Sequence, residues 1–264
     1  MSARRATTLG ARSDAALWLL DVWRQVYWDM VQFFRYRLIV ASTLLTSVSM
    51  VLAFGWGATA VPAPPGYSGS YFDYVFPGIL AVGVMFSCTY TLGYAVIVDF
   101  NRRAIEDVVL SPLSYSGFVL ARLLGMTLKC ALQFGVVLLI AGLGFGAQLG
   151  SPLWLALAFV LSCLCFAGLG VVCAVHTNEM SFASVVNLLL IPLTYFSGVF
   201  FPTANFGAAH QVLGHAPLAL HVALFRRALE GQPMAAELVA GALAYALLAM
   251  GVALYEFKRR VLRG

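Results

Sequence analysis

Long apolar runs alternate with short polar segments along almost the whole chain. Six of the runs approach or exceed the length of about 20 residues that a helix needs to cross the hydrocarbon of a bilayer. They cover residues 38–57, 76–98, 117–147, 153–175, 182–201 and 234–257. The runs are continuous and lack the period of two that marks the short strands of a membrane barrel. The pattern therefore predicts one all-α membrane domain over residues 1–264, in which residues 38–257 form a bundle of six transmembrane helices.

The stretch before the first run, residues 14–37, is amphipathic. Asp14 is a suitable helix N-cap, and apolar residues recur from there at helical spacing. Polar and charged residues, among them Arg24 and Arg35, fall on the opposite side. We expect a helix that lies in the membrane interface, because Arg35 and Arg37 would be costly inside lipid. The alternative is an ordinary start to the first span, and residues 1–13, rich in Arg, Ser and Ala, are expected to be disordered.

Residues 202–233 are a second stretch that does not fit a transmembrane helix. They are moderately apolar but interrupted by proline and glycine, including Pro217 and Gly231. A segment so broken does not span a bilayer, so we predict a re-entrant pair of short helices between spans five and six.

Charge supports a membrane protein and orients it. The chain is 61% hydrophobic and 10% charged, whereas soluble domains carry about 25% charged residues. Fourteen of the 16 Lys and Arg residues lie in the N-terminal region, in the connection 99–129 and at the C-terminus. This clustering is typical of topology signals and not of nucleic-acid binding, and it predicts a multi-pass protein of the inner or plasma membrane with both termini cytoplasmic. Arg226 and Arg227 are the exceptions, and Lys129 is expected to snorkel toward water.

The sequence lacks the motifs of the common catalytic sites. It contains no GxxxxGK[ST] nucleotide loop, no HExxH, no GxSxG and no paired carboxylates. His215 and His221 without a carboxylate are a weak metal site, so we predict no metal, and the five cysteines are interpreted as small buried hydrophobes. The first strongly apolar run starts too late for a signal peptide. Asp99 and Glu256 lie at span ends, where a relay for coupling ions is not expected.

A charged island, DFNRRAIED, follows the second span at residues 99–107. Arg102 and Arg103 stand at helical spacing from Glu106 and Asp107, so these side chains can form ion pairs on one short helix. The island is either a solvated loop or a surface on which a soluble partner docks.

Aromatic residues form two groups in and beside the spans. Phe86, Tyr90 and Tyr94 recur every four residues on one face of span two, and a second group, Tyr195, Phe196, Phe200 and Phe201, ends span five. Such rings either line a path or gate for a substrate or pack between helices. The tyrosines of the loop at 58–75 fit an aromatic belt.

Arg226 has two interpretations of its own. It either binds a lipid phosphate or an anionic substrate at the outer leaflet, or it holds the short helices by hydrogen bonds to carbonyls, and we favour the second. Glu230 lies four residues on, close enough to pair with it.

Three stretches of this sequence resemble the permease subunits of ABC type-2 exporters. The first runs from Pro77-Gly78 through the island to Leu110-Ser111-Pro112 and on to Arg122, Gly125, Lys129 and Gln133. The second is Ser197-Gly198-Val199-Phe200-Phe201-Pro202, and the third is Pro217 followed by Arg226 and Gly231. The family often has Gly-Thr before the acidic residue of the island, where this chain has Arg103-Ala104.

The resemblance implies a subunit that is not itself an enzyme. Two permease chains, here expected to be identical, would pair and dock on separate subunits that bind ATP and Mg. The coupling surface would comprise Asp99, Arg102, Arg103, Glu106, Asp107 and Pro112. The substrate would be an amphipathic molecule, such as a glycolipid, a lipid-linked saccharide or a drug, exported from the cytoplasm or inner leaflet. The alternatives are an ion-coupled carrier and a membrane enzyme or assembly factor that does not transport.

Overall fold

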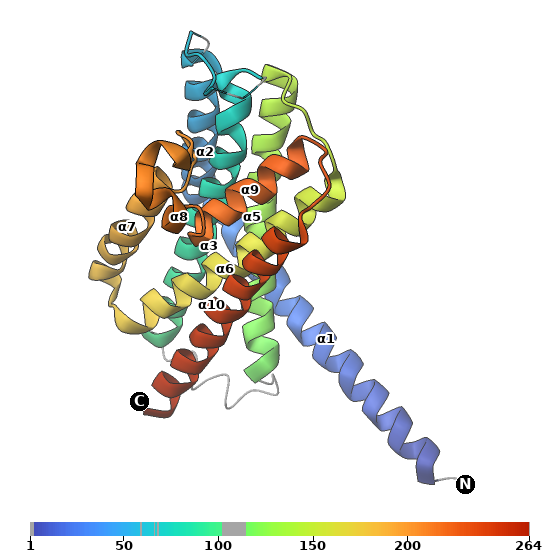
Figure 1. The fold of residues 1–264 in the computed structure, drawn as a ribbon. Helices are drawn as coiled ribbons and strands as arrows, with labels where there is room; N and C mark the ends of the chain where they lie inside the picture. Colours follow the sequence, from blue (N-terminus) through green and yellow to red (C-terminus); the bar gives the residue numbers. More distant parts are fainter. Residues whose placement is uncertain (1–2, 59, 66, 68, 102–114, 264) are drawn as a thin grey trace.

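The computed structural model describes residues 3–58, 60–65, 67, 69–101 and 115–263, and every regular element in these ranges is a helix (Figure 1). Five helices are long and apolar enough to cross a membrane. They are α3 (Tyr71–Asn101), α5 (Tyr115–Phe145), α6 (Pro152–His176), α7 (Glu179–Phe196) and α10 (Ala236–Arg263). The prediction of an all-α membrane protein is confirmed. The remaining expected span corresponds to α2 (Arg37–Gly57), whose described apolar part runs from Leu44 to Gly57.

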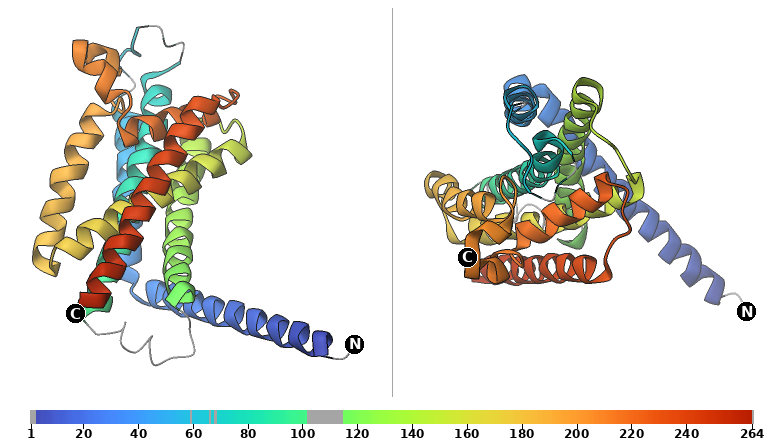
Figure 2. Two further views of the ribbon diagram at one scale, coloured as in Figure 1. Left: turned by 60° about the horizontal axis from the view of Figure 1, so that its bottom comes forward. Right: turned by 45° about the horizontal axis from the view of Figure 1, so that its top comes forward.

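Helix α1 (Ala3–Arg35) leaves the bundle and runs crosswise to its long helices (Figure 2). Tyr36 interrupts the helical backbone with φ −89° and ψ 74°, and α2 begins directly after it. α1 begins at Ala3 and not at Asp14, so the stretch expected to be disordered is helical. The abundance of Ala and Arg, both strong helix formers, accounts for this difference. The crosswise direction suits an interfacial helix.

α6 lies at the centre of the bundle, between α3 and α10. Glycines of α6 allow the backbones of α10 and α3 to approach it closely on its two sides. A Cβ on Gly168 would lie 2.6 Å from the backbone carbon of Ala249 in α10, and one on Gly170 would lie 2.9 Å from Cα of Thr89 in α3. The Thr89 hydroxyl also donates to the Phe166 carbonyl at 3.1 Å. Small residues that bring backbones together are a common way to pack helices in membranes.

The segment after α7 breaks into short helices, as predicted. These are η1 (Thr203–Ala209), α8 (His210–Leu213) and α9 (Pro217–Leu229). α7 ends at Phe196, earlier than the predicted end at 201, because the chain turns at Gly198 with φ +75°. Pro217 occupies the first turn of α9 and Gly231, with φ +68°, reverses the chain after it. α9 packs on α3 and α6 through buried residues such as Leu224.

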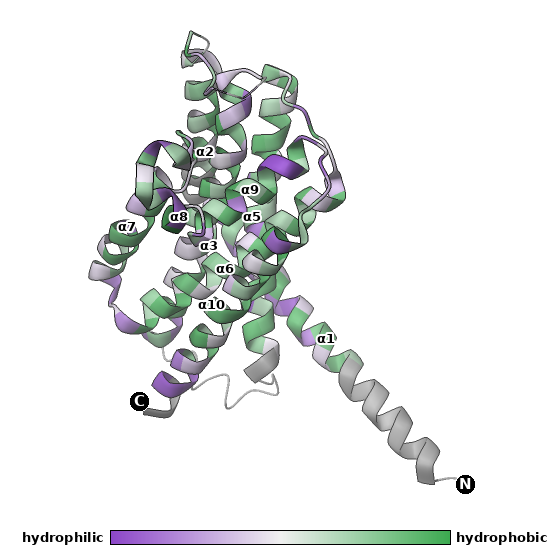
Figure 3. Ribbon diagram, in the orientation of Figure 1, coloured by the Kyte–Doolittle hydropathy of each residue, from purple (hydrophilic) through white to green (hydrophobic). Residues whose placement is uncertain are grey.

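The two ends of the bundle differ in the termini and connections that lie there. The C-terminus, α1 and the ends of α3 and α5 that flank the island lie at one end, here called the inner end. The connections at residues 60–65 and 146–151 lie at the other, the outer end. Hydrophilic residues gather at the C-terminal end of α10, the coloured part of α1 alternates between hydrophilic and hydrophobic residues, and the long helices are mostly apolar (Figure 3).

The close approach at α6 predicts a selective effect of small substitutions. Gly170→Ala should lower the melting temperature of the purified chain in detergent, because its Cβ meets backbone that cannot move aside, at a cost of about 1–3 kcal/mol. Gly251→Ala is the matched control in α10, since nothing lies within 4 Å of its Cβ position. The control should be neutral or slightly stabilising because alanine favours helix. A Gly170→Ala chain that melts like the unmodified one would contradict the close contact.

Candidate functional site

Four charged side chains from three helices meet near the inner end. We call them the inner cluster: Asp29 of α1, Asp99 of α3, and Arg122 and Lys129 of α5. Arg122 bridges two helices, because Nη2 donates to Asp99 Oδ1 and Nη1 lies 3.5 Å from Asp29 Oδ1. Lys129 Nζ lies 2.6 Å from Asp29 Oδ2. All four side chains are at least three-quarters buried. Removing one partner from such a cluster leaves a charge in a poorly solvated site.

The sequence of α5 shapes the space for this cluster. Gly125 lies between Arg122 and Lys129, and a Cβ there would overlap the Asp29 carboxylate. Next to the charges, Val22 and Val26 of α1 pack on Ala121. α1 is therefore fixed to α5 by charge and by an apolar contact together.

The inner cluster changes the interpretation of two residues singled out in the sequence. Asp99 was expected to belong to a docking surface, but its side chain is 5% exposed and is held by Arg122. Lys129 does not snorkel to water as predicted, since its side chain is 14% exposed and pairs with Asp29. Asp29 was missed, although it continues the helix face of Val22 and Val26 at a spacing of three residues.

The rest of the predicted coupling surface cannot be placed. Arg102, Arg103, Glu106, Asp107 and Pro112 lie outside the described residues. Their role as a docking surface stays a prediction.

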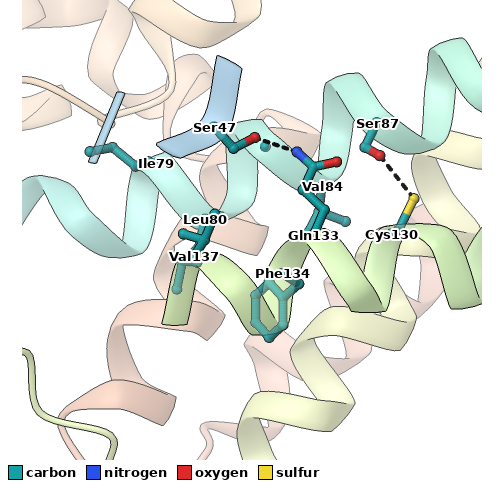
Figure 4. Close-up of a pocket in the computed structure, with 10 residues that line it drawn as sticks. Ser47, Ile79, Leu80, Val84, Ser87, Cys130, Gln133, Phe134 and Val137 are labelled. Atoms are coloured by element: carbon teal, nitrogen blue, oxygen red, sulfur yellow. Dashed lines mark hydrogen bonds between the residues drawn. The ribbon is translucent and has the colours of Figure 1, made fainter. Parts of the chain in front are cut away.

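A short polar seam joins α2, α3 and α5 further along the bundle (Figure 4). Gln133 donates to the Ser47 hydroxyl, and Ser87 Oγ lies 3.1 Å from Cys130 Sγ. These side chains line a cavity of about 10 Å³, close to the least that one water molecule needs. All five cysteines are free and buried, so the prediction of small buried thiols is confirmed.

At the outer end, the three stretches that carry the family resemblance converge on the start of α3. We call Tyr74, Gly78, Gly198, Val199 and Arg226 the outer anchor. A Cβ on Gly78 would lie 2.8 Å from Val199 Cγ1, so only glycine admits the buried Val199 at this distance. The Tyr74 hydroxyl donates to the Gly198 carbonyl at 3.4 Å.

Arg226 ties α9 to α3 within the outer anchor. Its guanidinium carbon lies 4.3 Å from the centre of the Tyr74 ring, and Nη2 donates to the Tyr74 carbonyl at 3.1 Å. This geometry supports the role of holding the short helices. Glu230 forms no ion pair with Arg226 and accepts a 3.4 Å hydrogen bond from Tyr67 instead. Burial, with the nearby carboxylate of Glu230, raises the pKa of Tyr67 to about 12, so this hydroxyl stays a donor at neutral pH.

The end of α9 is held by the connection between α5 and α6. Gly150 N donates to the Leu229 carbonyl at 3.1 Å and Ser151 N to that of Ala228 at 2.9 Å. A Cβ on Gly150 would overlap the backbone of Gly231. The tyrosines expected in an aromatic belt thus lie beside a fixed short helix, and Tyr74 is buried against it.

The aromatic stripe of α3 packs between helices. Phe86, Tyr90 and Tyr94 stack on one another with centres 6.2 and 5.9 Å apart, and Tyr94 meets Phe182 of α7 edge-on. The Tyr90 hydroxyl donates to Asn187 Oδ1 at 2.9 Å. The three rings of α3 are only half-buried, so a packing role leaves part of each ring accessible.

The second aromatic group divides into packed and exposed rings. Phe200 stacks on Phe54 of α2 with centres 5.4 Å apart. Tyr195, Phe196 and Phe201 are each about half exposed. A role as gate residues stays a prediction.

His215 and His221, singled out in the sequence, each lie against a carbonyl of their own segment, His215 Nδ1 at 2.7 Å from that of Gln211. His221 is buried with Nδ1 2.6 Å from the Pro217 carbonyl of its own helix, and its ring packs on Phe166. In the part of the chain that the structure describes, no three His, Cys, Asp or Glu side chains are close enough to hold a metal ion.

Comparison with known proteins gives a consistent result. The sequence profile described as "ABC-2 type transporter" matches residues 21–218, which include the inner cluster and most of the outer anchor. Nodulation protein J of Rhizobium leguminosarum bv. viciae is 28% identical over 230 residues, or 82% of this chain and 83% of that protein. Nodulation protein J of Sinorhizobium fredii is 26% identical over 192 residues (69% and 70%). Heme exporter protein B of Paracoccus denitrificans is 27% identical over 151 residues (57% and 66%). The chain belongs to the ABC-2 type transporter family.

Proposed function

We propose that this chain is the membrane permease of an ATP-driven exporter, whose partner subunit docks on residues 102–112 and drives α3 and α5 through the inner cluster. Membership of the family makes it an ABC transporter permease that works with an ATP-binding subunit. The inner cluster is the observation that carries the mechanism. Asp99 ends α3 and Arg122 lies early in α5, so one ion pair joins the two helices that flank the island.

Asp29 extends the same connection to α1. A force applied at the island would reach α3 and α5 directly and α1 through Asp29. The three helices would move together, because separating them would break buried ion pairs and leave charges without a partner in a poorly solvated site. ATP and Mg would be bound by the partner, and a second copy of this chain would complete the path.

We propose an amphipathic substrate. The half-exposed rings of Phe86, Tyr90 and Tyr94 offer flat apolar faces with hydroxyls at their edges, which suit a glycolipid, a lipid-linked saccharide or a hydrophobic drug. Heme exporter protein B is named for export of a flat amphipathic molecule, which supports this substrate class. The proposed direction is out of the cytoplasm or inner leaflet, with both termini cytoplasmic.

The docking proposal predicts a charge-sensitive island. Glu106→Lys should abolish co-purification of the ATP-hydrolysing subunit, since it reverses a charge on the proposed contact surface. Glu237→Lys is the matched control, because Glu237 is exposed at the start of α10 at the outer end. If the Glu106→Lys chain still co-purifies with the ATPase and transports normally, or if the unmodified chain binds no ATPase, the proposal is wrong.

The coupling proposal predicts a different defect for the inner cluster. Asp29→Asn should leave the ATPase bound but uncouple its hydrolysis from transport, because α1 loses its ion pairs with Arg122 and Lys129. Arg122→Leu should also destabilise the chain, by about 3–5 kcal/mol, since it removes the ion pair of the buried Asp99 and leaves Asp29 with Lys129 as its remaining ion-pair partner.

The control for these variants is Arg24→Ala. Arg24 pairs with Asp21 at 3.8 Å on the exposed side of α1, with 76% of its side chain accessible. Exposed pairs contribute little to stability, so melting and the ratio of ATP hydrolysed to substrate moved should stay unchanged. An Asp29→Asn chain with a normal ratio would refute coupling through α1.

A further inference from the structure

We propose that a cleft at the outer end binds the oxyanion headgroup, of the phosphate type, of an amphiphile. The cleft has a volume of about 440 Å³. Its walls come from the connection before α3, the turn after α7, the short helices η1 and α8, and α9. The residues on which the argument rests are Tyr74, Ser197, His210, Ala219, Val222 and Arg226. This inference concerns ligand binding by the permease chain and does not depend on the ATPase partner.

Arg226 supplies an uncompensated positive charge to the cleft. Within the described residues it belongs to no ion pair, and the one hydrogen bond found for its guanidinium goes to the neutral Tyr74 carbonyl. Its Nε is buried without a partner. The Tyr74 ring covers one face of the guanidinium, and the Arg226 side chain lines the cleft. A guanidinium edge is the group that best fits phosphate and similar oxyanions, through paired N–H donors.

Ser197 adds a second, independent observation. Its side chain is 2% exposed and lines the same cleft, and its hydroxyl has no hydrogen-bond partner. Buried hydroxyls in native proteins are almost always satisfied. An oxyanion in the cleft would accept from both Ser197 and Arg226.

The charges around the cleft favour an anion over a cation. His210 lines it and is held at Nδ1 by the Thr203 hydroxyl at 2.9 Å. Glu230 at the end of α9 does not line the cleft, and its carboxylate accepts a hydrogen bond from Tyr67, which does line it. Asp73 is also outside it and caps the start of α3 through Ser70.

Most of the remaining wall is apolar, which indicates an amphiphile and not a free ion. Pro64, Pro65, Ala219, Val222 and Ala223 line it. An oxyanion at Arg226 would therefore lie beside a surface suited to hydrocarbon. Two sources have this chemistry: the anionic lipids of the bilayer and a transported amphiphile.

The proposal can be tested by native mass spectrometry of the full chain in detergent. The probes are dioctanoyl phosphatidylglycerol, dodecyl phosphate and, as reference, dioctanoyl phosphatidylcholine. The unmodified chain should bind at least one anionic probe about tenfold more tightly than the reference, and Arg226→Gln should remove this preference. Ser197→Ala should weaken it about threefold, the loss of one hydrogen bond.

Arg227→Gln is the matched control. Arg227 is the next residue of α9, but it donates to the Pro233 carbonyl at 3.1 Å and does not line the cleft. Its substitution should leave probe binding unchanged. Arg226→Lys keeps the charge and should retain part of the preference, so the proposal stays testable through this variant and Ser197→Ala if Arg226→Gln fails to fold.

The two anionic probes separate the sources. Binding of phosphatidylglycerol assigns the cleft to a bilayer lipid headgroup, whereas binding of dodecyl phosphate alone assigns it to a single-chain amphiphile such as a transported molecule. Equal binding of all three probes by the unmodified chain would overturn the proposal. So would a preference for the anionic probes that is as strong in the Arg226→Gln chain as in the Arg227→Gln control.

Discussion

The shared ion pairing of Arg122 is the constraint on which the inner end of the structure depends. Charges buried at the edge of a bilayer must be matched by charges of opposite sign. Arg122 meets this requirement only when Asp99 and Asp29 reach it from two different helices. The end of α3 and the crosswise α1 are therefore both placed by one side chain of α5. The break at Tyr36 then allows α2 to leave α1 and enter the bundle.

α3 connects the two ends of the molecule. It is continuous from Tyr71 to Asn101, is held by charge at its inner end and by close packing on Val199 at its outer end. Between them Gly170 brings α6 against it. A continuous helix that is held at both ends transmits a displacement with little loss, because packed cores deform poorly. The inner cluster and the outer anchor are thus mechanically linked through α3, whichever substrate the path accepts.

The sequence predicts what is local and misses what depends on distant partners. The run at 153–175 matches α6 (Pro152–His176) closely, because apolar length alone determines a span. The early start of α3 at Tyr71 was missed, since Tyr74 is buried by Arg226, which lies far along the chain. Arg122 and Lys129 stood out by resemblance, but their partner Asp29 did not. The spacing of Asp29 from Val26 places it on the packed face of α1, but spacing within one helix does not show which charges lie opposite on another helix.

The charge of Arg226 calls for a reason beyond anchoring. Its visible contacts, one carbonyl and one ring, could be made by a neutral donor or an aromatic residue without the cost of desolvating a cation. In the proposed orientation, with both termini cytoplasmic, a basic residue at the outer end also opposes the usual distribution of charge in membrane proteins. The cost of desolvating the Arg226 cation is offset if an anion from outside the chain binds to it and supplies the opposite charge. The outer anchor is then a structural joint and a ligand site at once, so binding at the cleft acts directly on the end of α3.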